Sequence, residues 1–397
     1  MAIDVARGVV SRVRRERDSI VLQVQKASDP GAAAAAMARA AQDIARLGEG
    51  SGPDHGELLT PNWVSEVMEA GTGPLLMIDA KATPGRLLDR IPEMIVARLA
   101  EAGVADAVVA FPRQGGPVTA MLAGTDGTGL HRGVNLSLFP RPATLQETQR
   151  GHHEEFSDAL LVEGAAWVSE GLGADDQLGA VVASTEFPVR AGDALASLRQ
   201  AVAAGSQLEL VSGTSAGSVR RTLVKAPPLF AQVMLSAGGP AVDDDWLVAT
   251  FEALVAVARR LAPEVAYAGV GVDPGVGGPY SDWWRHGGDS SQLVRQLSDE
   301  YVFDAFAYQV LGPLHLARLG GPPAGSERLA GDRVGVMVGE PADWLLDPPE
   351  NPFLTNENVC GRRRDRTVQE RGRRLLAPCL VQKDQALHLL NARRDAR

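Results

Sequence analysis

The sequence predicts an α+β protein in which a helical N-terminal segment precedes two ferredoxin-like or sandwich halves with mostly antiparallel sheets. Helices and Val-rich strands do not alternate regularly, as a doubly wound parallel sheet would require. In both halves a helix ends abruptly before a strand. The chain of 397 residues is also long enough for two or three domains, because one core rarely serves more than about 250–300 residues.

Residues 1–72 are predicted to be the helical N-terminal segment. A helix is expected over 30–47, where Asp29 can cap it, Pro30 suits its first position and Gly48 can end it. The alanine-rich composition of this stretch also favours a helix.

The first α+β unit is predicted over 73–150 and the second over 151–346, followed by a Pro- and Arg-rich extension at 347–397. In the first unit the pattern indicates a helix at 84–102 and strands at 74–80, 104–111, 118–122 and 133–139. In the rest of the chain it indicates helices at 153–170, 191–204, 243–261 and 367–376, and strands at 181–187, 207–211, 219–224, 229–235, 265–272, 303–311 and 333–338.

Residues 243–273 combine one amphipathic helix with one buried strand. Leu247, Phe251 and Leu254 recur at spacings of four and three, which places them on one helical face. Asp243 and the two acidic residues after it can cap the helix and favour its start. The Val-rich strand that follows is expected to pack beneath the apolar face.

Composition and charge exclude several classes of protein. The formal net charge of −10 disfavours binding to nucleic acid or to an anionic membrane over the whole surface. No run of about 18 consecutive apolar residues is present, and the N-terminal residues lack the apolar core of a secretory signal. Cys360 and Cys379 are too few for a metal quartet. We therefore expect a cytoplasmic protein with two reduced thiols and no cofactor, metal or membrane span.

Residues 213–217 (GTSAG) fit the pattern G-x-S-x-G, in which small residues allow a tight turn that exposes a nucleophilic serine. The stretch also resembles the serine motif of patatin-like phospholipases, which would imply a serine hydrolase that uses Ser215. That chemistry needs a helix directly after the serine, whereas residues 218–225 alternate like a strand. We expect Ser215 to lie in a turn between antiparallel strands, and a serine hydrolase is the alternative function.

The preferred binding site lies in a loop rich in glycine and aromatic residues, at 275–288. Its polar and aromatic residues are Tyr280, Asp282, Trp283, Trp284, Arg285 and His286. Aromatic side chains and arginine are enriched in interfaces, so this loop predicts a protein-binding site. The alternative is that both tryptophans close one end of the core. Glycine-rich stretches at 124–133 and 269–278 fit no phosphate-binding motif and are expected to be loops.

Two further clusters have functional and structural interpretations. The cluster 152–155 (HHEE) contains metal-binding side chains, but no set of three or four ligands accompanies it, and we expect polar and acidic residues that cap a helix start. The run 362–374 holds seven arginines and offers a second alternative function, the binding of nucleic acid. We expect this run to be a solvated helix face, because the chain as a whole is acidic.

Two stretches resemble bacterial immunity-type α+β proteins associated with type VI secretion and polymorphic toxins. They are the helix and strand at 246–272 and residues 308–321 (YQVLGPLHLARLGG), where a helix ending in LGG follows an aromatic strand. The resemblance covers residues 181–346, and its motifs are mostly core and capping positions. It implies a cytoplasmic protein that binds another protein and catalyses no reaction, and it assigns no site residue.

Overall fold

The computed structural model divides into two compact units, and both are discontinuous along the chain. Unit 1 comprises residues 1–121, 177–211 and 224–228, and unit 2 comprises residues 122–176, 212–223 and 229–397. The α+β class is confirmed, since helices combine with two mostly antiparallel sheets. The structure describes residues 3–6, 9, 19–49, 68–70, 73–79, 85–111, 133–141, 157–170, 172, 178–182, 185–203, 207–213, 218–225, 232–239, 242–273, 297–302, 305–346, 367–381, 385, 388, 389 and 392.

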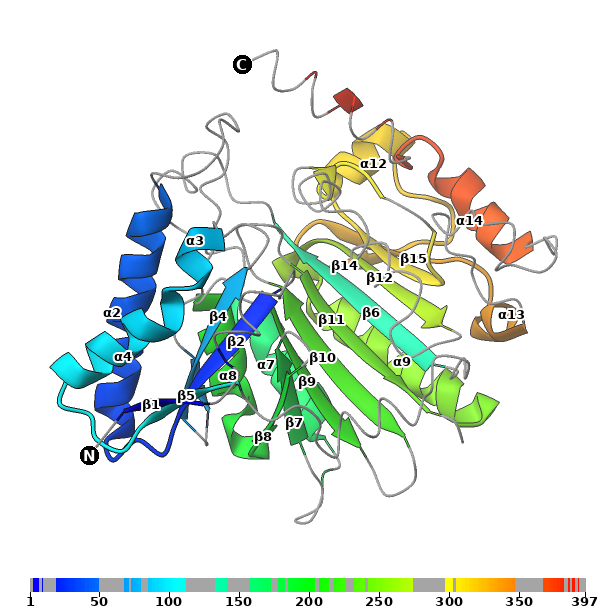
Figure 1. The fold of residues 1–397 in the computed structure, drawn as a ribbon. Coiled ribbons are helices and arrows are strands. Elements are labelled where there is room, and N and C mark those ends of the chain that lie inside the picture. Colours follow the sequence, from blue (N-terminus) through cyan, green and yellow to red (C-terminus); the bar gives the residue numbers. More distant parts are fainter. Residues whose placement is uncertain are drawn as a thin grey trace, which may run out of the picture. The chain divides into compact units, whose positions relative to one another are not determined.

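Unit 1 contains a sheet whose described strands follow the order β1-β5-β2-β4-β3 (Figure 1). These strands are β1 (Asp4–Val5), β2 (Ser19–Gln25), β3 (Met68–Ala70), β4 (Gly73–Asp79) and β5 (Val108–Ala110). β2 is antiparallel to both of its neighbours, β4 and β5, whereas β1 and β5 are parallel. The predicted helical N-terminal segment is therefore wrong for residues 19–25, which form the central strand of this sheet. Their β-branched and apolar side chains fit a buried strand.

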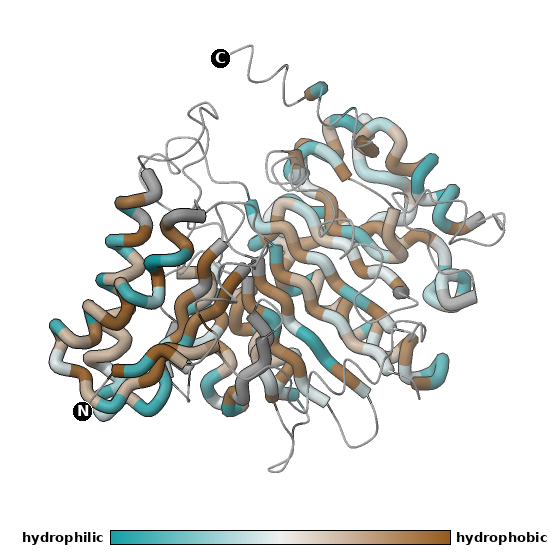
Figure 2. The backbone as a smooth tube through the Cα atoms, viewed as in Figure 1, coloured by the Kyte–Doolittle hydropathy of each residue, from teal (hydrophilic) through white to brown (hydrophobic). Residues whose placement is uncertain are grey.

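The helices described in the N-terminal part of unit 1 are α2 (Pro30–Glu49), α3 (Gly85–Leu88) and α4 (Ile91–Glu101). α2 begins as predicted, because the Asp29 carboxylate accepts a hydrogen bond from the Ala32 amide at 2.9 Å. Met37 of α2, Ile95 of α4 and Leu22 of β2 share one hydrophobic core. Figure 2 shows hydrophobic and hydrophilic residues interspersed along α2, as expected of a helix with one buried face.

The remaining described elements of unit 1 are β7 (Leu178–Val182), β8 (Thr185–Val189), the short 3-10 helix η1 (Ala191–Asp193), α8 (Ala194–Ala203) and most of β9 (Gln207–Gly213). Their strands follow the order β9-β7-β8. The segment predicted as one strand at 181–187 belongs instead to the antiparallel hairpin β7–β8. α8 buries Ala194, Leu198 and Ala201, which are four and three residues apart.

In unit 2 the described strands follow the order β14-β15-β13-β12-β6-β11-β10. They are β6 (Gly133–Pro140), β10 (Val219–Lys225, mostly in this unit), β11 (Gln232–Gly238), β12 (Val265–Asp273), β13 (Tyr308–Leu311), β14 (Glu327–Leu329) and β15 (Arg333–Met337). β6 is buried along its whole length and lies antiparallel between β11 and β12. Leu136 at its centre is opposite Leu235 on one side and Val270 on the other, so β6 is the centre of this core.

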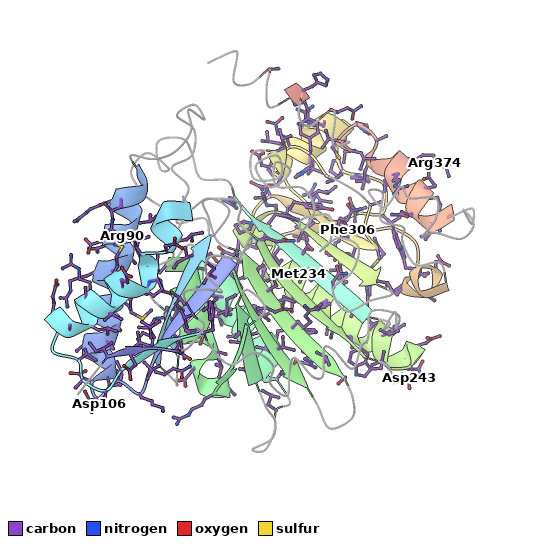
Figure 3. The ribbon with its side chains drawn as sticks, in the orientation of Figure 1. Arg90, Asp106, Met234, Asp243, Phe306 and Arg374 are labelled. Atoms are coloured by element: carbon purple, nitrogen blue, oxygen red, sulfur yellow. The ribbon has the colours of Figure 1, made fainter. Side chains whose placement is uncertain are left out.

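Helices α9 (Asp244–Arg260) and α7 (Asp158–Ser169) pack against these strands, and the 3-10 helix η2 (Ala262–Glu264) follows α9. Asp243, labelled in Figure 3, caps α9 by accepting a hydrogen bond from the Trp246 amide at 2.8 Å. Leu247, Phe251 and Leu254 are buried, as the periodicity predicts. α9 runs along β6 and β12 (Figure 1), and Arg260 of α9 forms an ion pair with Glu163 of α7 at 2.9 Å.

The C-terminal region, residues 305–346 and 367–381, completes unit 2. Its helices are α12 (Pro313–Leu319), α13 (Pro341–Leu346) and α14 (Thr367–Leu376). Trp344 of α13 is fully buried, and its indole N–H donates to the carbonyl of Val338 at 2.6 Å. α14 has the predicted bounds, whereas the strand predicted at 303–311 is shorter and begins at Tyr308.

Candidate functional site

Most residues of the predicted sites lie outside the residues that the structure describes. They are Ser215, the preferred binding loop at 280–286, the cluster 152–155 and the first part of the arginine run, 362–366. Their roles as catalytic, binding or metal-binding residues therefore stay predictions. The segments that flank two of these sites are described and bear on them.

The strands on either side of the GTSAG motif are β9, which ends at Gly213, and β10, which begins at Val219. The described residues after the motif thus form a strand, as their alternating pattern predicts. In β10 the buried hydroxyl of Thr222 donates to the carbonyl of Gly164 in α7 at 2.6 Å, which fixes this strand in the core. The described residues after the motif, 218–225, therefore offer no helix N-terminus to support an oxyanion.

Helix α14 carries the described part of the arginine run. Arg371 forms an ion pair with Asp343 of α13 at 3.6 Å, and Arg373 pairs with Glu370 at 3.0 Å. Arg374, labelled in Figure 3, donates from Nε to the carbonyl of Glu370 at 3.3 Å. These three arginines have partners inside the protein, as expected of a solvated helix face.

Within the described ranges, no three His, Cys, Asp or Glu side chains are grouped so that they could hold a metal ion. None of the helices in the described part of the chain is long and apolar enough to cross a bilayer. Cys379 is buried, and this burial raises the pKa of its thiol to about 12. Because the thiolate is the reactive form, this burial disfavours reaction at Cys379.

Arg333, the first residue of β15, is a buried cation without an ion-pair partner in the portion of the protein that is described. Only 8% of the residue is exposed. Its Nε donates to the carbonyl oxygen of Ala262 in η2 at 3.3 Å. A neutral carbonyl does not offset a full charge, and a buried charge without a counter-ion is unfavourable.

A second arginine binds the same turn. Arg141 directly follows β6, and its Nη2 donates to the carbonyl of Pro263, the residue next to Ala262, at 2.5 Å. The Arg141 side chain is exposed, and it forms no ion pair with any residue that the structure describes. The β6–β12 pairing positions it, because Pro140 lies opposite Val265, just after η2. Arg141 and Arg333 are called the arginine pair below.

Gly312, the N-cap of α12, provides the space that the Arg333 guanidinium fills. A Cβ atom added to Gly312 would lie 2.1 Å from Nη1 of Arg333. The backbone of Gly312, with φ −94° and ψ 176°, is open to any residue, so only the space that the Arg333 side chain fills favours glycine here. Pairing of Leu311 with Val334 between β13 and β15 sets this close approach.

The charge of Arg333 is only partly compensated. Burial lowers its pKa, and the nearby charge of Arg141 lowers it further, whereas Asp332 and Asp299 act in the opposite direction without reversing the shift. The guanidinium stays protonated nevertheless. The lowered pKa therefore means that its charge is unfavourable here, and a bound anion would relieve this.

His315 of α12 adds no positive charge at neutral pH. The residue is fully buried, and burial is the main cause that lowers its pKa to about 4. Its Nδ1 accepts a hydrogen bond from the Gly312 amide at 3.1 Å, so the proton of the neutral ring lies on Nε2. His315 thus holds the backbone of Gly312 in place beside the arginine pair.

Three large apolar side chains are exposed in the C-terminal region. They are Leu314 on α12, Met337 at the end of β15 and Leu375 on α14, with exposed fractions of 47%, 43% and 39%. The other large hydrophobic side chains that are exposed in the described structure are Leu47 and Val162. Methionine and arginine are enriched in protein–protein interfaces, and this region carries both.

The sequence did not identify the arginine pair. Arg141 comes just after the last strand of the predicted first unit, and Arg333 only begins a predicted strand. Four strands from distant parts of the chain bring them to one turn, which no local pattern encodes. The one local signal is Gly312 before Pro313, and it fits a helix cap as well as a close approach.

The stretch 308–321 that resembles immunity-type proteins is described throughout. Tyr308 is buried in β13, and Gly320 ends α12 with φ 77°, so these are core and capping positions, as expected from the sequence. No protein-family model matches the chain, and neither does any curated protein or solved structure.

Proposed function

We propose that this chain is a non-enzymatic factor that binds another protein in the cytoplasm of a bacterium, as immunity and accessory proteins do. The observation that supports the proposal is the exposure of Leu314, Met337 and Leu375 on three elements of unit 2. The predicted loop at 280–286 would supply aromatic contacts to the same partner.

The test uses defined candidates, namely the purified products of genes adjacent to the gene for this chain, with any toxin among them taken first. Binding is measured by isothermal titration calorimetry with the unaltered chain and with Leu314→Glu, Met337→Glu and Leu375→Glu. We expect at least one substitution to weaken binding by about tenfold or more, as truncation of an interface anchor does.

Val162→Glu is the matched control, because Val162 is as exposed as Met337, at 43%, and lies on α7 of the same unit. Equal losses in the control and in all three variants would argue against a specific surface. For the serine hydrolase alternative, the assay is stoichiometric labelling by a fluorophosphonate. Labelling that Ser215→Ala abolishes would contradict the non-enzymatic part of the proposal.

A further inference from the structure

The arginine pair has an arrangement that the protein itself does not complete. Arg333 and Arg141 donate to consecutive backbone carbonyls, those of Ala262 at 3.3 Å and Pro263 at 2.5 Å. Each uses one N–H in this way, out of the five that a guanidinium carries. Neutral carbonyl acceptors therefore hold the two like charges at one turn. No carboxylate in the described ranges forms an ion pair with either arginine.

The position of Arg333 is fixed by its surroundings. Gly312 leaves room for Nη1, and no side chain could replace the glycine without moving the guanidinium. Among the residues described, Nη1 and Nη2 of Arg333 have no hydrogen-bond partner. Neither nitrogen is fully enclosed by the protein. Arg141 reaches the same turn from the end of β6 and is exposed, so a ligand has access from its side.

Two features distinguish this arrangement from an arginine that merely caps a turn. A cap needs one cation, whereas here a second cation lies close enough to lower the pKa of the first. The nearby acids, Asp332 and Asp299, do not compensate for burial and for Arg141 together. Planar guanidinium groups bind carboxylate and phosphate through paired N–H donors, and such charge-assisted bonds are the strong ones.

We propose that Arg141 and Arg333 together bind the oxyanion of a ligand, a phosphate or carboxylate group, at the turn formed by Ala262 and Pro263. This site is independent of the protein-binding surface proposed above, since it uses none of the same side chains. Bridging the two guanidinium groups would give the anion hydrogen bonds from both and would offset their mutual repulsion.

The test titrates the full chain with inorganic phosphate and, separately, with acetate, against sodium chloride at the same ionic strength. Binding is measured by calorimetry and by the shift of the thermal unfolding midpoint, which rises when a ligand binds the folded state. We expect one oxyanion to raise the midpoint above its value in chloride. Arg141→Gln should weaken that binding on the order of tenfold to a hundredfold, the effect of losing a charged hydrogen-bond donor.

Arg328→Gln is the matched control, because Arg328 is an exposed arginine of the same unit that lies on β14. It should bind the anion as the unaltered chain does. Arg333→Lys keeps the charge but loses the paired N–H donors of the guanidinium, and it should also bind the anion more weakly. If this variant fails to fold, the binding measured with Arg141→Gln is the test of the proposal. A response to phosphate only or to acetate only supports the site and names its group. No response beyond chloride, unchanged binding in Arg141→Gln, or equal loss in Arg328→Gln would overturn the proposal.

Discussion

Replacing Gly312 by alanine should destabilise the protein, although the backbone alone predicts the opposite. At φ −94° and ψ 176° alanine is unstrained. An unstrained Gly→Ala change stabilises a protein by about 0.4–1 kcal/mol, because it reduces the entropy of the unfolded chain. The new Cβ atom would lie 2.1 Å from Nη1 of Arg333, so the sign of the change reports whether the guanidinium is held there.

The expected size follows from the contacts that must give way. To reach ordinary contact at 3.4 Å from the present 2.1 Å, Nη1 has to move by 1.3 Å, or the strand has to move with it. That movement strains the hydrogen bond from Nε of Arg333 to Ala262, and such a bond from a charged donor is worth about 1.5–3 kcal/mol. Overpacking of a filled site costs about 1–3 kcal/mol. These terms overlap, so we expect a net loss of about 2–4 kcal/mol in the free energy of unfolding.

The assay is urea unfolding of four proteins in a double-mutant cycle: the unaltered chain, Gly312→Ala, Arg333→Ala and the double variant. With Arg333 removed, the carbonyl of Ala266 is the one that remains of the three atoms nearest to the new methyl group, at 3.3 Å. Alanine at 312 should then cost less than about 1 kcal/mol, which gives a coupling of at least about 1 kcal/mol. Additive effects, or a Gly312→Ala protein more stable than the unaltered chain, would refute this account of the glycine.

Three further predictions concern the helices of unit 2. Asp243→Ala should lower the free energy of unfolding by about 1 kcal/mol through loss of the α9 cap, whereas Asp245→Ala, which removes the same charge without the cap, should cost clearly less in urea unfolding. Trp344→Phe should cost about 1–3 kcal/mol, because it leaves a buried carbonyl without its donor at 2.6 Å; thermal unfolding that does not change would contradict this. The pKa of His315 is lowered to about 4, so the unfolded chain takes up its proton first and stability falls as the pH drops from about 6.5 to 4, by about 3 kcal/mol in all. Urea unfolding across this range should show a shallower loss in His315→Asn, and identical slopes would exclude His315 as the cause.

The parts of the fold that were predicted correctly are those with a strong local pattern. The α9 helix has acidic residues at its start and apolar residues at regular spacing, and α14 has an amphipathic pattern. The strand β2 was missed, because the segment before α2 was interpreted together with the alanine-rich helix that follows. Its own residues, SIVLQVQ, are typical of a strand and could have indicated it.

The candidate site could not be predicted in the same way. The place of Arg333 depends on the register of β13 against β15, and that of Arg141 on the register of β12 against β6. Register follows from the packing of whole strands, and one residue of slippage would turn each side chain to the other face. A single sequence contains arginines in many places, and only the assembled sheet distinguishes a buried, uncompensated one from a solvated one.

The central position of β6 has a consequence for how the chain can be made. Both of its partners come much later in the sequence, β11 at residues 232–238 and β12 at residues 265–273. Until the ribosome has translated β11 and β12, the eight residues of β6 have no strand to pair with, and their backbone hydrogen-bonding groups are unpaired. These residues are all buried in the folded protein. Such a strand can pair with other nascent chains, so a chaperone that shields it should raise the yield of native protein. Cutting the chain between β6 and β11 would leave two fragments, neither of which holds the complete core of unit 2.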